Sequence, residues 1–109
     1  MTIKPMSFEM DKRQQDFVTA YVECIEWADN IELSESDLQD AIVDAVYFHI
    51  KYSHLWDAIV DDQAGHDLWL TRNGHGAGFW DRTADVYPEE NAQALTEAAE
   101  HFGPKHYLA

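Results

Sequence analysis

Cysteine is almost absent from the sequence, with Cys24 the only one among 109 residues. A single thiol excludes an intrachain disulfide and a cysteine-based zinc site, and it gives no sign of an oxidising compartment. We therefore expect Cys24 to be a small buried apolar residue rather than a reactive thiol.

Long hydrophobic runs are absent as well. No segment approaches the roughly 18 consecutive apolar residues that a membrane span needs, and residues 1–16 lack the apolar middle of a secretory signal peptide. We expect a soluble protein that makes no contact with a membrane and stays in the cytoplasm.

Basic residues are the scarcest class of charged side chain. Seven Lys and Arg stand against 21 Asp and Glu, which gives a formal net charge of −14, and residues 14–50 contain no Lys or Arg at all. Because nucleic-acid affinity is built mostly from contacts between basic side chains and phosphates, direct binding to DNA or RNA is excluded first. The same charge would instead attract a basic groove on another protein.

What the sequence does have is hydrophobic patterning of helical period. Apolar residues make up 46% of the chain, enough for one core, and residues 1–109 are interpreted as a single acidic domain. Apolar side chains repeat at helical spacing over residues 8–29, and Ser34 can cap a second helix that continues to Ile59 with a break near residues 53–54. Pro88 near a start and Gly103 at a stop indicate a C-terminal helix.

Between these helices, residues 65–82 have the pattern of a β-hairpin. Leu68 and Leu70 alternate with polar or aromatic neighbours as in a half-buried strand, and Asn73-Gly74 is a turn signal. We predict an α+β fold with two or three N-terminal amphipathic helices, one β-hairpin and one C-terminal helix. The hairpin would carry a dense set of reactive and aromatic side chains: His66, Asp67, Trp69, Arg72, His75, Trp80, Asp81 and Arg82.

Several kinds of chemistry are open to this segment. A metal site or an acid–base pair would use its histidines and aspartates, which are His66, Asp67, His75 and Asp81. Their spacing matches no metal signature, and the glycines of residues 74–78 would precede a strand rather than the helix that a phosphate loop opens. The simplest interpretation is structural, with glycines in a tight turn and Trp side chains packed on the helices. We expect no cofactor and no metal, and keep a small metal-dependent or acid–base enzyme as an alternative.

The acidic side chains of the N-terminal half fall in rows on the outer faces of the two predicted helices. Neighbours in such a row lie about 5 to 6 Å apart, so within a Debye length of about 8 Å the row acts as a continuous strip of charge, like a phosphate backbone. The ordinary alternative is a solvated face that keeps a small protein soluble. Apolar side chains project among the carboxylates, as they do in contact surfaces. The predicted partner-binding residues are Glu23, Glu26, Trp27, Asp37, Asp40, Val43, Asp44 and Tyr47.

Two resemblances bear on function. Residues 65–82 (GHDLWLTRNGHGAGFWDR), followed by LTEAA at residues 95–99, resemble the hallmark of a family of small, acidic, uncharacterised bacteriophage and prophage proteins. That resemblance implies a phage origin and a location in the host cytoplasm, and it brings no activity or catalytic residue with it. More weakly, residues 36–42 (SDLQDAI) are similar to the acidic helix of phage antirestriction proteins that imitate DNA.

Taken together, these features favour a phage-encoded inhibitor, not an enzyme, that binds the basic groove of a host nucleic-acid-processing or defence protein through its acidic helices. The alternative is a phage accessory protein that binds a host factor through the Gly/Trp/His-rich hairpin. A second copy of the chain, in a homodimer, is kept as a further partner.

Overall fold

The computed structural model describes residues 10–74, 78–82, 86–105 and 107. These residues form four α-helices and three short 3₁₀ turns, and none of them lies in a strand. The α-helices are α1 (Lys12–Asp29), α2 (Glu35–Tyr52), α3 (Asp61–Arg72) and α4 (Glu89–Phe102), and the 3₁₀ turns are η1 (Ser53–Leu55), η2 (Ala58–Val60) and η3 (Phe79–Arg82). The described chain is all-α, so the predicted α+β class is wrong.

Short-range hydrogen bonds determine the ends of the first two helices. The Asp11 carboxylate accepts the N–H of Gln14 at the start of α1, and Asn30 ends that helix in the left-handed conformation, with φ 53°. The Ser34 hydroxyl accepts the N–H of Asp37, which confirms the predicted start of α2. The turn η1 follows α2 at the predicted break.

The C-terminal helix also has its predicted limits. Pro88 stands immediately before α4, where its fixed φ suits a helix start, and Gly103 follows the last helical residue with φ 81°. The apolar side chains Ala92, Leu95 and Ala99 are fully buried, so this face of α4 covers the core.

The segment predicted as the first strand of a hairpin is the helix α3. Its buried positions include 61, 64, 65, 68, 69 and 72, which is the three- and four-residue spacing of a helix. Asp61 and Arg72 are charged and Gly65 has no side chain, so a search for apolar periodicity passes over half of this stripe. The Asn73-Gly74 signal marks the end of the helix, where Gly74 has φ 71°.

The predicted second strand is replaced by η3, which packs between α3 and α4. The Phe79 N–H donates to Thr71 Oγ1 at 3.0 Å, and a Cβ placed on Gly78 would lie 1.8 Å from the same oxygen. The Phe79 ring is buried against Phe48 and Tyr87, with centroids 6.0 and 5.4 Å away. This segment therefore contributes an aromatic side chain to the core.

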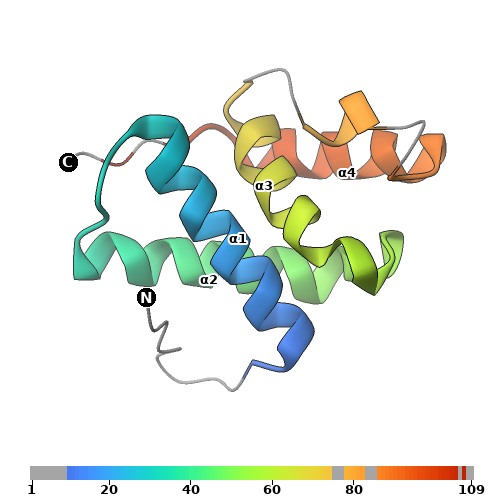
Figure 1. The fold of residues 1–109 in the computed structure, drawn as a ribbon. Helices are drawn as coiled ribbons and strands as arrows, with labels where there is room; N and C mark the ends of the chain where they lie inside the picture. Colours follow the sequence, from blue (N-terminus) through green and yellow to red (C-terminus); the bar gives the residue numbers. More distant parts are fainter. Residues whose placement is uncertain (1–9, 75–77, 83–85, 106, 108–109) are drawn as a thin grey trace.

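α1 and α3 lie side by side and cross in front of α2, while α4 lies beyond α3 (Figure 1). The closest approach of α1 and α3 is at Gly65, where an added Cβ would lie 2.4 Å from the carbonyl oxygen of Phe17 and 2.9 Å from the Cβ of Ala20. Only glycine lets the two helix backbones come this close.

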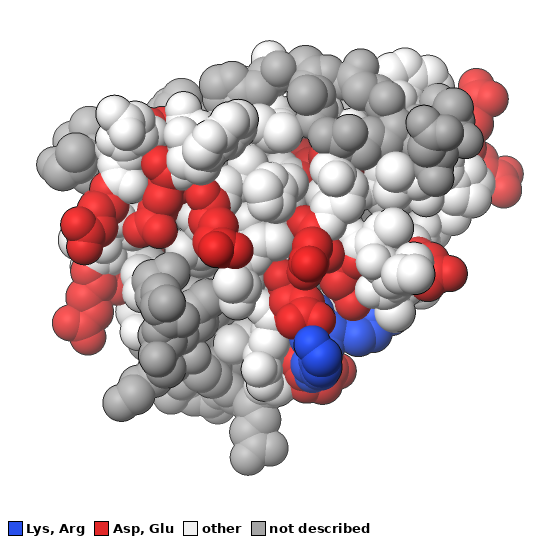
Figure 2. Space-filling model, in the orientation of Figure 1, with Lys and Arg blue, Asp and Glu red and all other residues white. Residues whose placement is uncertain are grey.

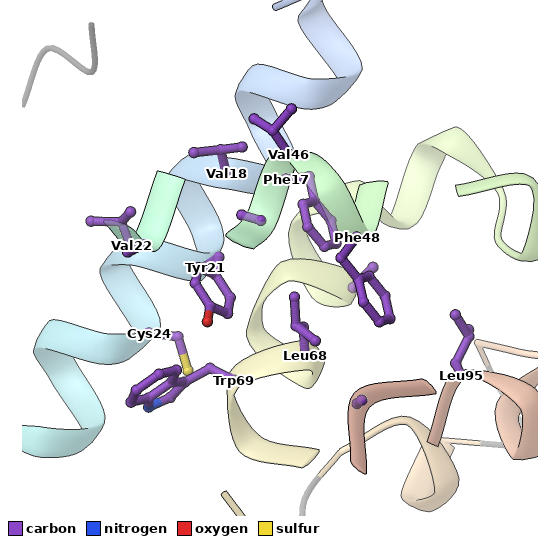
Figure 3. Close-up of a cluster of buried hydrophobic side chains, with 14 of the residues drawn as sticks. Phe17, Val18, Tyr21, Val22, Cys24, Val46, Phe48, Leu68, Trp69 and Leu95 are labelled. Carbon is purple, nitrogen blue, oxygen red and sulfur yellow. The ribbon is translucent and has the colours of Figure 1, made fainter. Parts of the chain in front are cut away.

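Aromatic rings fill the space between the helices (Figure 3). The rings of Phe17 and Trp56 stack with centroids 5.2 Å apart, and Tyr21 meets Trp69 edge-on at 5.7 Å. Cys24 is buried in the same core, and burial raises the pKa of its thiol to about 12. The predicted role of Cys24 as a buried apolar residue is confirmed. No helix among the described residues is long and apolar enough to cross a membrane.

Candidate functional site: an acidic face on α1 and α3

The acidic row predicted on α2 is partly neutralised by one basic residue of α3 and one that follows α4. Asp44 accepts a hydrogen bond from Arg72 Nη1 at 3.0 Å, and Asp40 pairs with Lys105 Nζ at 2.8 Å. The Tyr107 hydroxyl also donates to Asp40 at 2.7 Å. Hydrogen bonds from Lys105 and Tyr107 lower the pKa of Asp40 from its ordinary value. Asp40 and Asp44 thus hold the C-terminal segment against α2.

The remaining residues predicted on α2 are more open. Asp37 is half-buried in the first turn, while Val43 and Tyr47 are 46% and 53% exposed. The Tyr47 ring lies 5.9 Å from that of Phe102, and its hydroxyl accepts a hydrogen bond from Lys51 at 3.4 Å. Asp37, Val43 and Tyr47 therefore remain accessible.

A second group of carboxylates surrounds a hollow between α1 and α3. The hollow has a volume of about 290 Å³ and is lined by Asp16, Thr19, Ala20, Glu23, Asp62 and His66. Asp16 pairs with Lys12 at 2.9 Å, an exposed contact of small energetic value. Within the part of the chain that the structure describes, neither Glu23 nor Asp62 forms an ion pair.

Figure 2 shows this side of the molecule in the orientation of Figure 1. Acidic side chains are spread over it, whereas Lys and Arg gather at its lower edge, near the start of α1. We call this surface, made by Asp16, Glu23 and Asp62, the α1/α3 acidic face. The three carboxylates line one hollow, so each contributes to the negative potential there.

An exposed tryptophan continues the α1 row of this face. Asp16, Glu23 and Trp27 are spaced by seven and four residues, which places them on one side of the helix. Trp27 is 76% exposed, and among the large apolar side chains that the structure describes only Ile59 is more exposed. Glu26 turns toward the α1–α2 connection, where its carboxylate accepts the N–H of Leu33 at 3.2 Å. The predicted residues Glu23 and Trp27 thus belong to one accessible surface.

Those predicted hairpin residues that the structure describes do not form one site. Trp69 and Arg72 are buried and Asp67 is inaccessible, with its carboxylate bound by the Tyr87 hydroxyl at 2.7 Å and the Gln63 amide at 2.9 Å. His66 instead lines the acidic hollow, and Trp80 is 49% exposed on η3. The remaining predicted members, which are His75 and the side chains of Asp81 and Arg82, lie outside the described residues.

His66 and Asp67 are consequently directed to different sides of α3, which does not support an acid–base pair between them. Nor does any group of three or more His, Cys, Asp or Glu side chains, among those that the structure describes, have the arrangement to hold a metal ion. The carboxylates that border the hollow attract positive charge.

A buried polar cluster that the sequence did not reveal lies beneath the other end of α1. Arg13 donates to both carboxylate oxygens of Asp61 at 3.0 Å, and Trp56 Nε1 donates to Asp61 Oδ1 at 2.7 Å. His49 Nε2 lies 3.7 Å from the same oxygen and makes no hydrogen bond to a described residue. Burial lowers the pKa of His49 more than the Asp61 carboxylate raises it, since that carboxylate is already paired with Arg13. The sequence contained one sign of this cluster: Asp61 lies four residues before Gly65 and seven before Leu68, which places the three on one side of a helix.

Comparison with models of known families, with curated proteins and with solved structures finds no match.

Proposed function

We propose that this protein binds the basic nucleic-acid-binding groove of another protein and blocks it, presenting carboxylates where the groove would receive phosphates. The observation that carries the proposal is the α1/α3 acidic face, where Glu23 and Asp62 border one hollow with no ion-pair partner among the described residues and Trp27 stands exposed beside them. The resemblance to phage proteins points to a host defence or nucleic-acid-processing protein as the target.

The proposal moves the main contact from α2 to α1 and α3. Asp40 and Asp44 are already paired with Lys105 and Arg72. They therefore contribute less negative potential outside the molecule than unpaired carboxylates do. Glu23 and Asp62 are exposed, and they can pair with Lys or Arg of a partner without first breaking a contact. Trp27 supplies apolar area of the kind that anchors interfaces.

The formal net charge of −14 has a kinetic consequence. A basic groove would be found quickly by electrostatic steering, and raising the salt concentration would slow association and weaken the complex. A contact made mainly by buried apolar groups would respond to salt in the opposite direction or hardly at all.

The test is capture on the immobilised full-length chain from a bacterial lysate, with elution by salt between about 50 and 500 mM and identification of the eluted protein. We expect a DNA- or RNA-binding protein whose nucleic acid competes with this chain. Glu23→Gln combined with Asp62→Asn should weaken the complex at least about tenfold, roughly 1.4 kcal/mol.

A matched control separates local contact from net charge. Glu97→Gln combined with Glu90→Gln removes the same charge from α4, and Glu90 is the second residue of its helix just as Asp62 is of α3. If both double variants weaken capture equally, only long-range charge matters and the α1/α3 acidic face is not the contact. A captured partner that binds its nucleic acid and this chain at the same time would contradict the proposal.

A further inference from the structure

The outer side of α2 carries a stripe that the core does not use. Exposed or half-exposed residues recur at 36, 40, 43, 47, 50 and 54, with alternating spacings of four and three. The centre of the stripe is apolar: Val43, Tyr47 and Ile50 are 46%, 53% and 69% exposed. The buried residues of α2, such as Ile42, Val46 and His49, lie on its other side.

Alternating steps of three and four are the spacing of a seam between two packed helices. An isolated exposed apolar side chain needs no explanation, but three in register on one helix form a continuous strip. Among the described residues, the contacts printed to this strip from outside α2 are the Phe102 ring beside Tyr47, and the Lys105 and Tyr107 side chains on Asp40 at its N-terminal end.

Acidic residues lie toward the N-terminal end of the stripe and basic residues toward its C-terminal end. Asp40 stands in its N-terminal half with Asp37 and Asp44 beside it, and His54 stands at its C-terminal end with Lys51 beside it. An antiparallel copy of the same helix would bring the basic end of each α2 to the acidic half of the other. A parallel copy would bring like charges together.

Two of the three carboxylates beside the stripe are already paired within the chain. Arg72 and Lys105 neutralise Asp44 and Asp40, and Lys51 stands on the stripe's flank, 5.6 Å from the centre of the Tyr47 ring. Two chains that each carry a formal charge of −14 repel one another, so contact is least costly where carboxylates are already paired. The unpaired carboxylates of the α1/α3 acidic face would point away from such a contact.

We propose that two copies of this chain form a symmetric dimer in which their α2 helices pack antiparallel, with the two-fold axis close to Tyr47. In this arrangement Val43 of each copy faces Ile50 of the other, and Lys51 meets the turn of the other copy that carries Asp40 and Asp44. An 18-residue helix is about 27 Å long, which makes a small interface, so the dimer has a dissociation constant in the micromolar range.

The dimer is independent of the proposed function, because it uses the opposite side of α2 and leaves Glu23, Trp27 and Asp62 accessible. The two contacts also respond to salt with opposite sign. Salt screens the repulsion between two acidic copies and strengthens the dimer, whereas it weakens binding to a basic groove. Failure of one proposal is therefore distinguishable from failure of the other.

The first experiment is sedimentation velocity on the full-length chain over a roughly hundredfold range of concentration around the micromolar scale. We expect a monomer–dimer equilibrium that shifts toward dimer as salt is raised, and we expect Tyr47→Glu to abolish the dimer. Trp27→Glu is the control, since it places the same charge on an exposed aromatic of α1, and it should leave the dimer intact. Helical content by circular dichroism verifies that both variants fold.

A second measurement keeps the proposal testable if Tyr47→Glu does not fold. Cys24 is buried and its thiol has a raised pKa, so a newly introduced cysteine is the accessible thiol for a short bis-maleimide cross-linker. Tyr47→Cys should give covalent dimers, and Ile59→Cys, on a residue that is 87% exposed and outside the stripe, should give few. A single species with the mass of one chain at every concentration, or equal cross-linking of the two cysteine variants, would overturn the dimer.

Discussion

Arg72 of α3 donates a hydrogen bond to Asp44 of α2 across 3.0 Å, although 28 residues separate them in sequence. The same guanidinium donates to the Tyr21 hydroxyl at 2.9 Å and to the carbonyl oxygen of Gly103 at 2.8 Å. One buried cation thus joins α1, α2, α3 and the end of α4. Because all of these groups lose water on folding, their stability depends on the complete set of hydrogen bonds.

Replacing Arg72 by Met should lower the free energy of unfolding by about 3 kcal/mol, since the substitution leaves a partly buried carboxylate and a buried phenol without their donor. Urea denaturation followed by circular dichroism measures the change. Lys12→Met is the control, because Lys12 makes an exposed ion pair with Asp16 and its loss should change the free energy of unfolding much less than the loss of Arg72. Equal losses for the two variants would show that Arg72 is not a structural hub.

Asp61→Asn should destabilise the fold by about 3 kcal/mol. The amide cannot accept two charge-assisted hydrogen bonds from Arg13, and it leaves that guanidinium without its counter-charge. The neighbouring Asp62→Asn removes an exposed charge from the same turn of α3 and should cost less than about 1 kcal/mol. Thermal melts of the two variants, run in parallel, measure this difference. A smaller loss of stability for Asp61→Asn than for Asp62→Asn would contradict the assignment.

His49 should make the protein less stable in mild acid. Its pKa in the folded state lies below the ordinary 6.5, mainly because burial disfavours the charged ring. The unfolded chain therefore binds the proton more readily, so the contribution of His49 is complete above pH 6.5 and is lost as pH falls from 6.5 toward the folded-state pKa.

The measurement is the free energy of unfolding from about pH 7.5 to pH 5 for the native chain and for His49→Gln. The native chain should lose more stability over this window than the variant. His54→Gln, at an exposed position on η1, is the control for the substitution of a histidine by glutamine. Parallel profiles for the native chain and His49→Gln would refute the prediction.

Gly65→Ala distinguishes helix propensity, which would raise the free energy of unfolding, from packing against α1, which would lower it. Propensity alone would stabilise α3 by about 1 kcal/mol, but the new Cβ would lie 2.4 Å from the Phe17 carbonyl oxygen, so α1 and α3 would have to move apart. We expect a net loss of about 3 kcal/mol. Gly74→Ala, where no atom lies within 4 Å and only the positive φ is unfavourable, should cost about 1 kcal/mol. A gain of stability for Gly65→Ala would refute the close contact.

The sequence was most informative where structure depends on neighbouring residues. A Ser34 hydroxyl that caps α2 and a Pro88 that precedes α4 act within one helical turn, so their effects are visible in a short segment. The apolar side of α1 was visible for the same reason. These signals locate three of the four α-helices.

The prediction from sequence was wrong at α3, where the buried side of the helix contains charged residues. Asp61 and Arg72 occupy core positions of α3 because Arg13 and Asp44, from other helices, neutralise them there. Neither partner is near in sequence, so the apolar periodicity passed over both positions and the segment from His66 to Arg72 was predicted as a strand. The Gly-rich turn reinforced that error, because a glycine with positive φ ends a helix as readily as it joins two strands.

By itself, the sequence determined the sign of the charge, the positions of three helices and the single buried thiol, because these depend on composition or on residues within a few positions of each other. Only the tertiary structure decided which carboxylates stay unpaired. Folding carries Arg72 and Lys105 to Asp44 and Asp40, and leaves Glu23 and Asp62 around an open hollow without an ion-pair partner among the described residues. An ion pair depends on distance in space, and its energy falls too steeply with that distance for sequence separation to predict it.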